Sequence, residues 1–302
     1  MPLVVAPQAA GLPTTPYLTT AEYKAAPTDV DLTSLVPGGT QAQQDDALSV
    51  VIGQASSWMD GYVHYTLGAT LDVETARVRV NRDGYVRVPT RGIPIQEIDS
   101  FSIGATPSRM QAVTAATAAD AWFQDNVIWM PVIVAPASPP YVALFAPGDR
   151  VFCQWSYVNG YANTLLAATA NAGDSSIQVK SGLGIYAGTS LVIYDSGQTE
   201  TIQVASSYTS TTAPGTVTLP LASSLLYKHT TAGVSVSALP PNAKKAAILA
   251  TTAFIKMRGA SGLVMDSIED HSPKEMSGED GGLEDLAVAE TLLARYILPT
   301  YF

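Results

Sequence analysis

The chain has 302 residues, of which 47% are hydrophobic and 14% charged, so it is long enough for two folded domains and carries few charges. The chain has 26 acidic and 16 basic residues, and its net charge of -10 argues against a protein that binds nucleic acid through the phosphates. A single cysteine and three scattered histidines exclude an internal disulfide and a common type of zinc site.

Residues 1–17 are expected to form an extended N-terminal arm. Four prolines interrupt this stretch, and it lacks the basic start of a signal peptide. No part of the sequence reaches the roughly 18 consecutive apolar residues that a membrane span requires, so no membrane partner is expected.

A first long helix is predicted at residues 41–67. Apolar side chains recur there at helical spacing, and Gly68 supplies a C-terminal stop. The residues of this stripe are Leu48, Val51, Ile52, Ala55, Trp58, Met59 and Tyr62. A short helix at residues 21–26 precedes it, after the capping hydroxyls of Thr19 and Thr20. The apolar stripe needs a partner surface, which other helices of the chain would supply.

After residue 70 the pattern changes to a period of two, which predicts strands. Residues 76–80 and 85–88 are predicted to form a hairpin, with valines on one face and arginines on the other. The basic face consists of Arg77, Arg79, Arg82 and Arg87. It is either a solvated strand face or a surface that meets an acidic partner or a DNA channel. Shorter strands are predicted at residues 95–103, 122–134 and 151–158.

Residues 163–237 differ in composition from the rest of the chain. Ser, Thr, Ala, Gly and Val dominate this stretch, and few of its residues are charged. Short β-prone runs separated by turns with Gly and Ser predict a small antiparallel barrel or sandwich. We interpret the stretch as an inserted β domain, because helical patterns lie on both sides of it in the sequence.

Helical patterns return beyond the insertion. An Ala-rich apolar repeat predicts a helix at residues 240–259, and Pro299 ends a second amphipathic helix predicted at 283–298. We expect both to pack with the first long helix in one bundle. The predicted fold class is therefore α+β, a helical bundle with a β-hairpin and short strands and an inserted small antiparallel β barrel or sandwich. The core would comprise residues 18–162 and 238–302.

The sequence contains no recognisable catalytic, cofactor-binding or metal-binding motif. Residues 266–285 hold eight carboxylates beside His271, which predicts a solvated acidic loop, with a cation site or a basic partner as alternatives. Asp60 and His64, four residues apart, predict a pair on a helix surface. Cys153 lies in an apolar strand and is interpreted as a buried structural thiol. No enzyme activity, cofactor or metal is expected.

Three tryptophans lie in the strands predicted beyond the hairpin: Trp122, Trp129 and Trp155. Nucleic-acid surfaces of the base-stacking type interleave aromatic and basic side chains. No basic residue lies next to these tryptophans in the sequence, so they are expected to pack in a core or an interface.

Two segments on either side of the insertion carry a family resemblance. Residues 151–161 read VFCQWSYVNGY, and residues 239–247 read LPPNAKKAA. This order resembles the head-to-tail connector (adaptor) family of tailed bacteriophages, in which a strand ending in a Gly-Tyr turn leads through a Pro-bearing link into an Ala-rich helix. Further matching pieces are residues 18–23 (LTTAEY), 267–269 (SIE) and 292–296 (LLARY). The insertion is the main departure from the family.

The resemblance implies a structural subunit of the phage neck and not an enzyme. Members of the family form a ring, commonly of twelve subunits, that docks on the portal protein and joins the head to the tail. A stopper or tail-completion protein would lie beneath the ring, and double-stranded DNA would pass through its lumen without sequence-specific binding. The expected location is the neck of the virion, and the host cytoplasm during assembly.

Two alternatives to this function remain open. The first is another ring protein of the neck or tail, such as a stopper or a tail terminator. The second, more remote, is a carbohydrate-binding or carbohydrate-active protein, which could use the inserted β domain and its tyrosines.

For portal binding, the sequence points to the C-terminal end. Ile297, Leu298, Tyr301 and Phe302 form an apolar, aromatic end with no evident core to fill. These four are the predicted partner-binding residues. The alternative is that this end packs on its own bundle.

Overall fold

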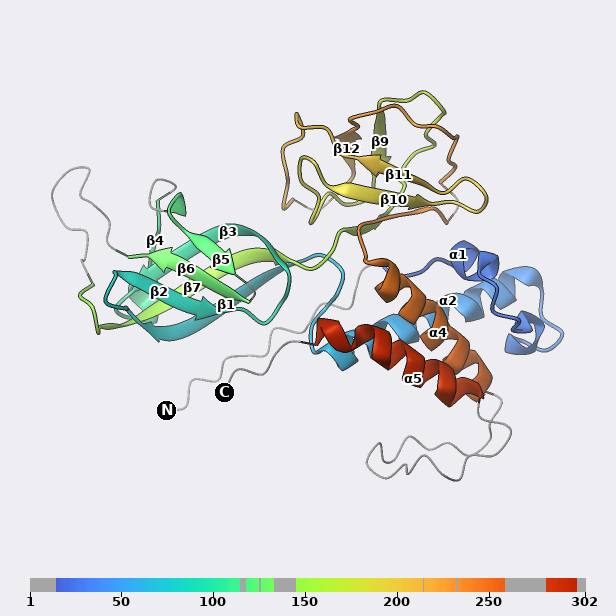
Figure 1. Cartoon of the computed structure of the whole chain (residues 1–302), viewed down its shortest axis with the longest axis horizontal. Coiled ribbons are helices and arrows are strands. Elements are labelled where there is room, and N and C mark those ends of the chain that lie inside the picture. The colour runs from blue at the N-terminus through green and yellow to red at the C-terminus, as the bar shows by residue number, and fades with distance from the viewer. Residues whose placement is uncertain are drawn as a thin grey trace.

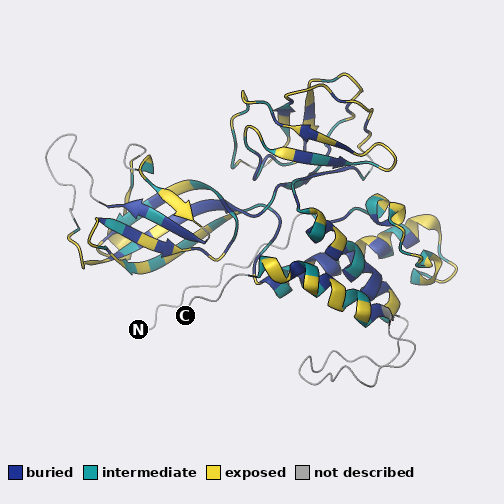
Figure 2. Ribbon diagram, in the orientation of Figure 1, coloured by how far each residue is buried: buried dark blue, intermediate teal, exposed yellow. Residues whose placement is uncertain are grey.

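The computed structural model describes residues 15–114, 118–124, 126–132, 145–213, 215–231, 233–258 and 281–297. In this part of the chain the elements gather into three lobes, each with its own hydrophobic core (Figure 1). Buried residues lie inside each lobe, and exposed residues cover it (Figure 2). Among the described helices, none is long and apolar enough to cross a membrane.

The helical lobe combines segments from both sides of the strands. Its elements are α1 (Thr20–Ala25), η1 (Leu32–Leu35), α2 (Gln41–Val63), α4 (Pro241–Arg258), α5 (Gly281–Leu293) and η3 (Ala294–Tyr296). Capping boxes at Thr19 and Thr40 begin α1 and α2, because their side chains pair with backbone N–H groups of the first turn. Apolar residues of α2, among them Leu48, Ile52 and Met59, share one core with the alanines of α4.

The strands between α2 and the insertion form the first β lobe. They are β1 (Thr70–Arg79), β2 (Tyr85–Pro89), β3 (Ile95–Gly104), β4 (Gln111–Ala112), β5 (Trp122–Gln124), β6 (Val127–Pro131) and β7 (Arg150–Asn159), with η2 (Pro107–Arg109) between β3 and β4. They build two antiparallel sheets, ordered β1-β7-β3-β4 and β2-β6-β5. One core takes residues from both sheets, including Val86, Ile128 and Trp155.

The inserted stretch forms the second β lobe. Its strands are β8 (Asn163–Leu165), β9 (Ser176–Val179), β10 (Ser190–Tyr194), β11 (Glu200–Gln203), β12 (Val217–Pro220) and β13 (Ser235–Ser237). They build an antiparallel sheet ordered β11-β10-β13-β8 and a β12-β9 pair. More and less buried residues alternate along β9, β10 and β11, so each of these strands contributes one face to the core of this lobe.

The predicted fold class is wrong. The described residues form thirteen strands in four antiparallel sheets, so the chain is not a helical bundle to which a hairpin and an inserted barrel are added. The strands of residues 70–159 cover one another's apolar faces, so they form a separate core and do not need the helices. The first long helix also ends earlier than predicted, at Val63, because His64 takes a left-handed C-cap conformation with φ 68°.

A short stretch of paired backbone joins the first β lobe to the helical lobe. Tyr161 N donates to Leu67 O (2.8 Å), and Ala69 N donates to Tyr161 O (2.7 Å). Gly160 precedes this contact with φ +83°, and a Cβ there would lie 2.4 Å from Gly68 O. Only glycine fits both the left-handed conformation and the close approach.

Candidate functional site

The four arginines predicted to form a basic face are all exposed in the first β lobe. Arg77 and Arg79 lie on β1, Arg87 lies on β2, and Arg82 lies in the turn between these strands. Val86, the neighbour of Arg87, is fully buried. The arginines therefore point away from the core of the lobe, as the period of two in the sequence indicates.

Strand register aligns three arginines and two tryptophans in two sets, one on each sheet of the lobe. Arg150 of β7 lies opposite Arg79 of β1. Arg87 of β2 lies opposite Trp129 of β6, which in turn lies opposite Trp122 of β5. These five residues are named the Arg–Trp row.

The two sheets meet in the middle of the Arg–Trp row. An isolated antiparallel bridge pairs Val80 with Val86, and it is the only pairing between β1 and β2 among the described residues. Arg79 lies opposite Arg150 in its own sheet, and Arg87 lies next to the bridge on the edge strand of the other sheet. Like charges that lie directly opposite each other destabilise a sheet, so this arrangement is costly unless an anion relieves it.

At its aromatic end the row is tightly stacked. The rings of Trp122 and Trp129 are parallel within 7°, with centroids 4.9 Å apart. The guanidinium of Arg87 lies 5.5 Å from the centroid of the Trp129 ring. Trp122 at the end of the stack is 45% exposed, so one indole face is open to a partner.

The charges of the row are unbalanced. In the described ranges, no carboxylate forms an ion pair with an arginine of the row. Arg77, next to the row on β1, lies over the ring of Phe152 at 5.4 Å. Stacked guanidinium groups keep their N–H edges free, and these edges fit carboxylates or phosphates.

Sequence reasoning found part of this surface. Arg79 and Arg87 were among the predicted basic residues, whereas Arg150, Trp129 and Trp122 were not linked to them. The tryptophans were expected only to pack, because no arginine is adjacent to them in the sequence. In the fold an arginine does stack on one of them, through a strand pairing that the local pattern does not specify.

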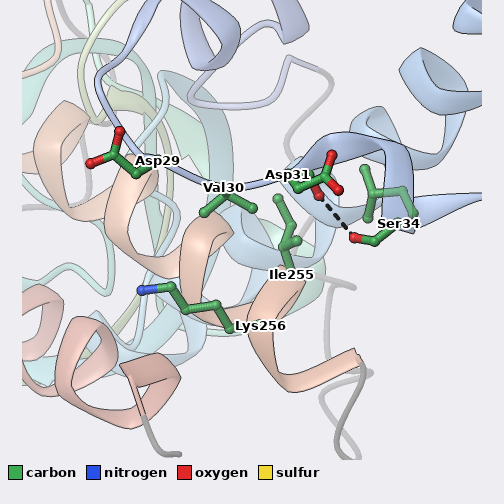
Figure 3. A pocket seen from close by; sticks show the side chains of 7 residues that line it. Asp29, Val30, Asp31, Ser34, Ile255 and Lys256 are labelled. Carbon is green, nitrogen blue, oxygen red and sulfur yellow. Dashed lines mark hydrogen bonds between the residues drawn. The ribbon is translucent and has the colours of Figure 1, made fainter.

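A hollow of about 590 Å³ lies in the helical lobe, between the η1 segment and the end of α4 (Figure 3). Its lining is Asp29, Val30, Asp31, Ser34, Leu35, Ile255 and Lys256. It is named the acidic hollow. Hydrogen bonds from Oγ1 (2.7 Å) and N (2.9 Å) of Thr33 lower the pKa of Asp31, so this carboxyl is ionised at neutral pH.

The one cation that lines the acidic hollow is already paired. Lys256 Nζ lies 2.7 Å from Asp285 Oδ2 on α5. Neither Asp29 nor Asp31 has an ion-pair partner among the described residues. The hollow therefore combines negative charge at its edge with the apolar side chains of Val30 and Leu35.

Of the predicted portal-binding residues, the structure describes only Ile297, which follows η3 and is half-buried. Leu298, Tyr301 and Phe302 lie outside the described residues, and their role stays a prediction. Most of the predicted acidic loop, residues 266–280, lies outside them as well.

A buried polar cluster fixes a loop of the second β lobe. The fully buried ring of His229 contacts Asp195 Oδ2 through Nδ1 (3.0 Å) and Glu200 Oε1 through Nε2 (2.7 Å). Glu200 also accepts hydrogen bonds from the backbone N of Leu226 (2.9 Å) and Tyr227 (3.2 Å). Burial by itself would raise the pKa of Glu200, but these hydrogen bonds outweigh it and lower the pKa. These contacts hold the loop at Leu226 and Tyr227 in place.

Two other titratable residues also have structural roles. Asp60 does not form the predicted pair with His64, and accepts hydrogen bonds from Tyr17 Oη and from Leu67 N (3.1 Å). Burial raises the pKa of Asp60 to about 6. Cys153 is fully buried as expected, and burial raises its pKa to about 12, which keeps the thiol protonated and unreactive.

No family model matches this chain, and no curated protein and no solved structure matches it either. Two surfaces stand out in the described residues on geometry and charge. The Arg–Trp row is basic and aromatic, and the acidic hollow is negative with an apolar wall. Both are suited to contacts with another macromolecule.

Proposed function

We propose that this chain is a non-enzymatic structural subunit of the neck of a tailed bacteriophage. Copies of the chain assemble into a ring, of twelve subunits as is common in the family that the sequence resembles. The ring docks on the portal protein, joins the head to the tail through a stopper or tail-completion protein, and leaves a channel for double-stranded DNA. It belongs to the virion and assembles in the host cytoplasm.

The observation that carries this proposal is that parts of several segments resembling the connector family meet at the core of the helical lobe. Tyr23 of α1 and Thr252 of α4 are joined by a hydrogen bond between Oη and Oγ1 (2.9 Å). Tyr161, just after β7, packs edge-on against Tyr296 near the C-terminus, with ring centroids 6.4 Å apart. All three tyrosines belong to the helical core or pack against it. Pieces that are distant in the sequence thus meet in space.

The geometry of the insertion supports the same assignment. Ala238 N donates to Ala162 O (2.8 Å), so the two ends of residues 163–237 lie side by side. Without the insertion, the end of β7 would still lead directly to the start of α4. That link from strand to helix is the feature of the family that the sequence resembles, and the second β lobe would be a peripheral addition.

Native mass spectrometry and electron microscopy with the portal protein of the same genome test the proposal. The expected result is a closed ring of this chain on the portal, with the second β lobe visible as extra density. A chain that neither binds the portal nor forms a ring with it would contradict the proposal.

A second candidate is another ring protein of the neck or tail, a stopper or a tail terminator. The observation in its favour is the content of β structure, since thirteen strands in four antiparallel sheets occur in the described residues. The long helices α2 and α4 argue against such proteins, which are expected to be mostly β. Binding to purified tails in place of the portal would favour this candidate.

A further inference from the structure

We propose that the Arg–Trp row of one copy of this chain docks in the acidic hollow of a second copy. The row and the hollow would then form one head-to-tail interface, repeated around a ring. This inference rests on the proposed function, because it names the surfaces through which the ring closes.

The row has the composition of an interface centre. Tryptophan and arginine are the residue types most enriched among those that dominate the binding energy of protein interfaces. Arg79 lies directly opposite Arg150, so a carboxylate partner would both pair with the row and relieve the repulsion between these two arginines. The open indole face of Trp122 supplies an apolar contact beside these charges.

The acidic hollow has the complementary features. Asp29 and Asp31 stand at the hollow without an ion-pair partner among the described residues, and Val30, Leu35 and Ile255 give it an apolar wall. Its volume of about 590 Å³ lies within the range of roughly 300–1,000 Å³ found for sites that enclose a small molecule, so it has room for an indole ring.

The positions of the two surfaces fit a head-to-tail contact. The row lies in the first β lobe and the hollow lies in the helical lobe, at the two ends of the long axis of the chain (Figure 1). When the row of each copy binds the hollow of the next copy, the growing assembly keeps one free row and one free hollow at its ends. The assembly closes into a ring when the rotation between neighbouring copies brings these two ends together.

Nucleic acid fits the row less well than a protein surface. The chain has a net charge of -10, which repels a polyanion at long range. Trp129 is covered on one side by Trp122 and on the other by Arg87, which leaves one indole face of the row for a base. Surfaces for single strands usually offer a series of aromatic faces to successive bases.

The test uses two variants of the full chain that leave the backbone undisturbed. The row variant carries Arg79→Glu and Arg87→Glu, both at exposed positions. The hollow variant carries Asp29→Asn and Asp31→Asn, because asparagine tolerates the positive φ of position 29 (52°) and can cap η1 as Asp31 does. Matched controls are Arg82→Glu, in the turn outside the row, and Asp46→Asn, exposed on α2. Circular dichroism verifies the fold of each.

Native mass spectrometry and sedimentation, with and without the portal protein, provide the readout. Each variant by itself should lose ring assembly, with the concentration needed for assembly raised by about tenfold or more, while the controls assemble as the natural chain does. Mixed together, the two variants should stop at a 1:1 dimer. In that dimer the intact row of the hollow variant occupies the intact hollow of the row variant, and no further copy can add.

The outcomes separate this inference from the proposed function. If rings form by themselves or on the portal, and both variants form them equally well, the inference is wrong and the proposed function stands. If the natural chain forms no ring even with the portal, the proposed function fails and the inference fails with it. If a labelled single-stranded oligonucleotide binds the natural chain but not the row variant, and assembly is unchanged, the row is a nucleic-acid surface and the inference is overturned.

Discussion

Lys244 and Glu22, which are 222 residues apart in the sequence, form a buried ion pair with Nζ 2.7 Å from Oε1. The same ammonium group lies 3.3 Å from Ser235 Oγ and 4.2 Å from the ring centroid of Tyr194. One cation therefore connects α4 to α1 and to the second β lobe. Burial lowers the pKa of Lys244, and the carboxylate of Glu22 opposes that shift.

Replacing this lysine should weaken the junction between the helical lobe and the second β lobe. We expect Lys244→Met to lower the free energy of unfolding by about 3–5 kcal/mol, because it leaves the charge of Glu22 buried without a cation. Adding Glu22→Gln should recover part of the loss, since glutamine keeps the hydrogen bond to Thr19 N without the charge. Urea unfolding followed by circular dichroism measures both.

The exposed pair of Lys24 and Asp45 provides a control for that experiment. Lys24→Met should cost less than about 1 kcal/mol, because water screens a pair at the surface. A double variant at positions 244 and 22 that is no more stable than Lys244→Met would show that the buried charge is not the cause of the loss.

Local signals in the sequence predicted the elements better than their arrangement. The periodicity and caps of α2 and α4 involve neighbouring residues, and both helices lie within a few residues of the prediction. The pairing of Arg79 with Arg150 depends on two strands far apart in the chain, and the packing of the whole lobe sets it. The helical bundle was predicted because helical patterns lie on both sides of the insertion. The predicted hairpin is wrong, because β1 pairs with β7 and β2 pairs with β6, in two separate sheets.

The same limit applies to the candidate site. The exposure of Arg79 and Arg87 follows from the alternation with buried valines, so the sequence could predict it. The stack of Arg87 on Trp129 required the register between β2 and β6. For the acidic hollow, the η1 segment and the end of α4 come from opposite ends of the chain, so no local pattern indicates it.

The buried carboxyl of Asp60 should make stability fall as the pH rises through the weakly acidic range. Burial raises its pKa from 3.8 to about 6, so between these values the folded protein holds this proton and the unfolded chain does not. The contribution of this group to stability is therefore greatest below about pH 4 and is lost as the pH rises above about 6.

Melting temperatures measured from about pH 4 to pH 8 in the natural chain and in Asp60→Asn test this expectation. The asparagine side chain of that variant cannot ionise, so the fall should be much smaller there. His64→Asn is the control, because it removes the nearby histidine while asparagine accepts the left-handed conformation of position 64. If His64→Asn flattens the curve and Asp60→Asn does not, the effect belongs to the histidine.

Glu200 should have the opposite effect from Asp60: its contribution to stability should fall as the pH is lowered. Its pKa is lowered in the fold although burial opposes this, because hydrogen bonds from Leu226 N, His229 and Tyr227 N favour the charged form. Its contribution to stability is present above the ordinary value of 4.5 and is lost as the pH falls through the lowered pKa. We therefore expect the loop of the second β lobe around Tyr227 to loosen in acid.

Hydrogen exchange at Leu226 and Tyr227 measures this loosening residue by residue. Glu200→Gln should speed exchange there at neutral pH, with a loss of about 1–3 kcal/mol in local stability, because a neutral side chain bonds more weakly to His229 and the two N–H groups. Amides of α2 serve as the internal control and should not change. Uniform acceleration across the protein would mean that the variant unfolds the chain globally.

Gly160 should be the glycine at which a methyl group causes most damage to the junction of the first β lobe with the helical lobe. Gly160→Ala places a Cβ 2.4 Å from Gly68 O at a residue with φ +83°. The left-handed conformation costs about 1–2 kcal/mol by itself, and the contact with a backbone oxygen forces the chain to shift.

Gly197→Ala separates these two effects. Position 197 has a similar φ of +78°, but a Cβ there meets nothing within 4 Å, so this variant pays only the conformational cost. Thermal unfolding should therefore show a clearly larger loss for Gly160→Ala than for Gly197→Ala, with the backbone bonds of Leu67 and Tyr161 weakened in hydrogen exchange. Equal losses in the two variants would mean that the close approach of Gly160 to Gly68 relaxes at no cost and does not fix how the lobes are joined.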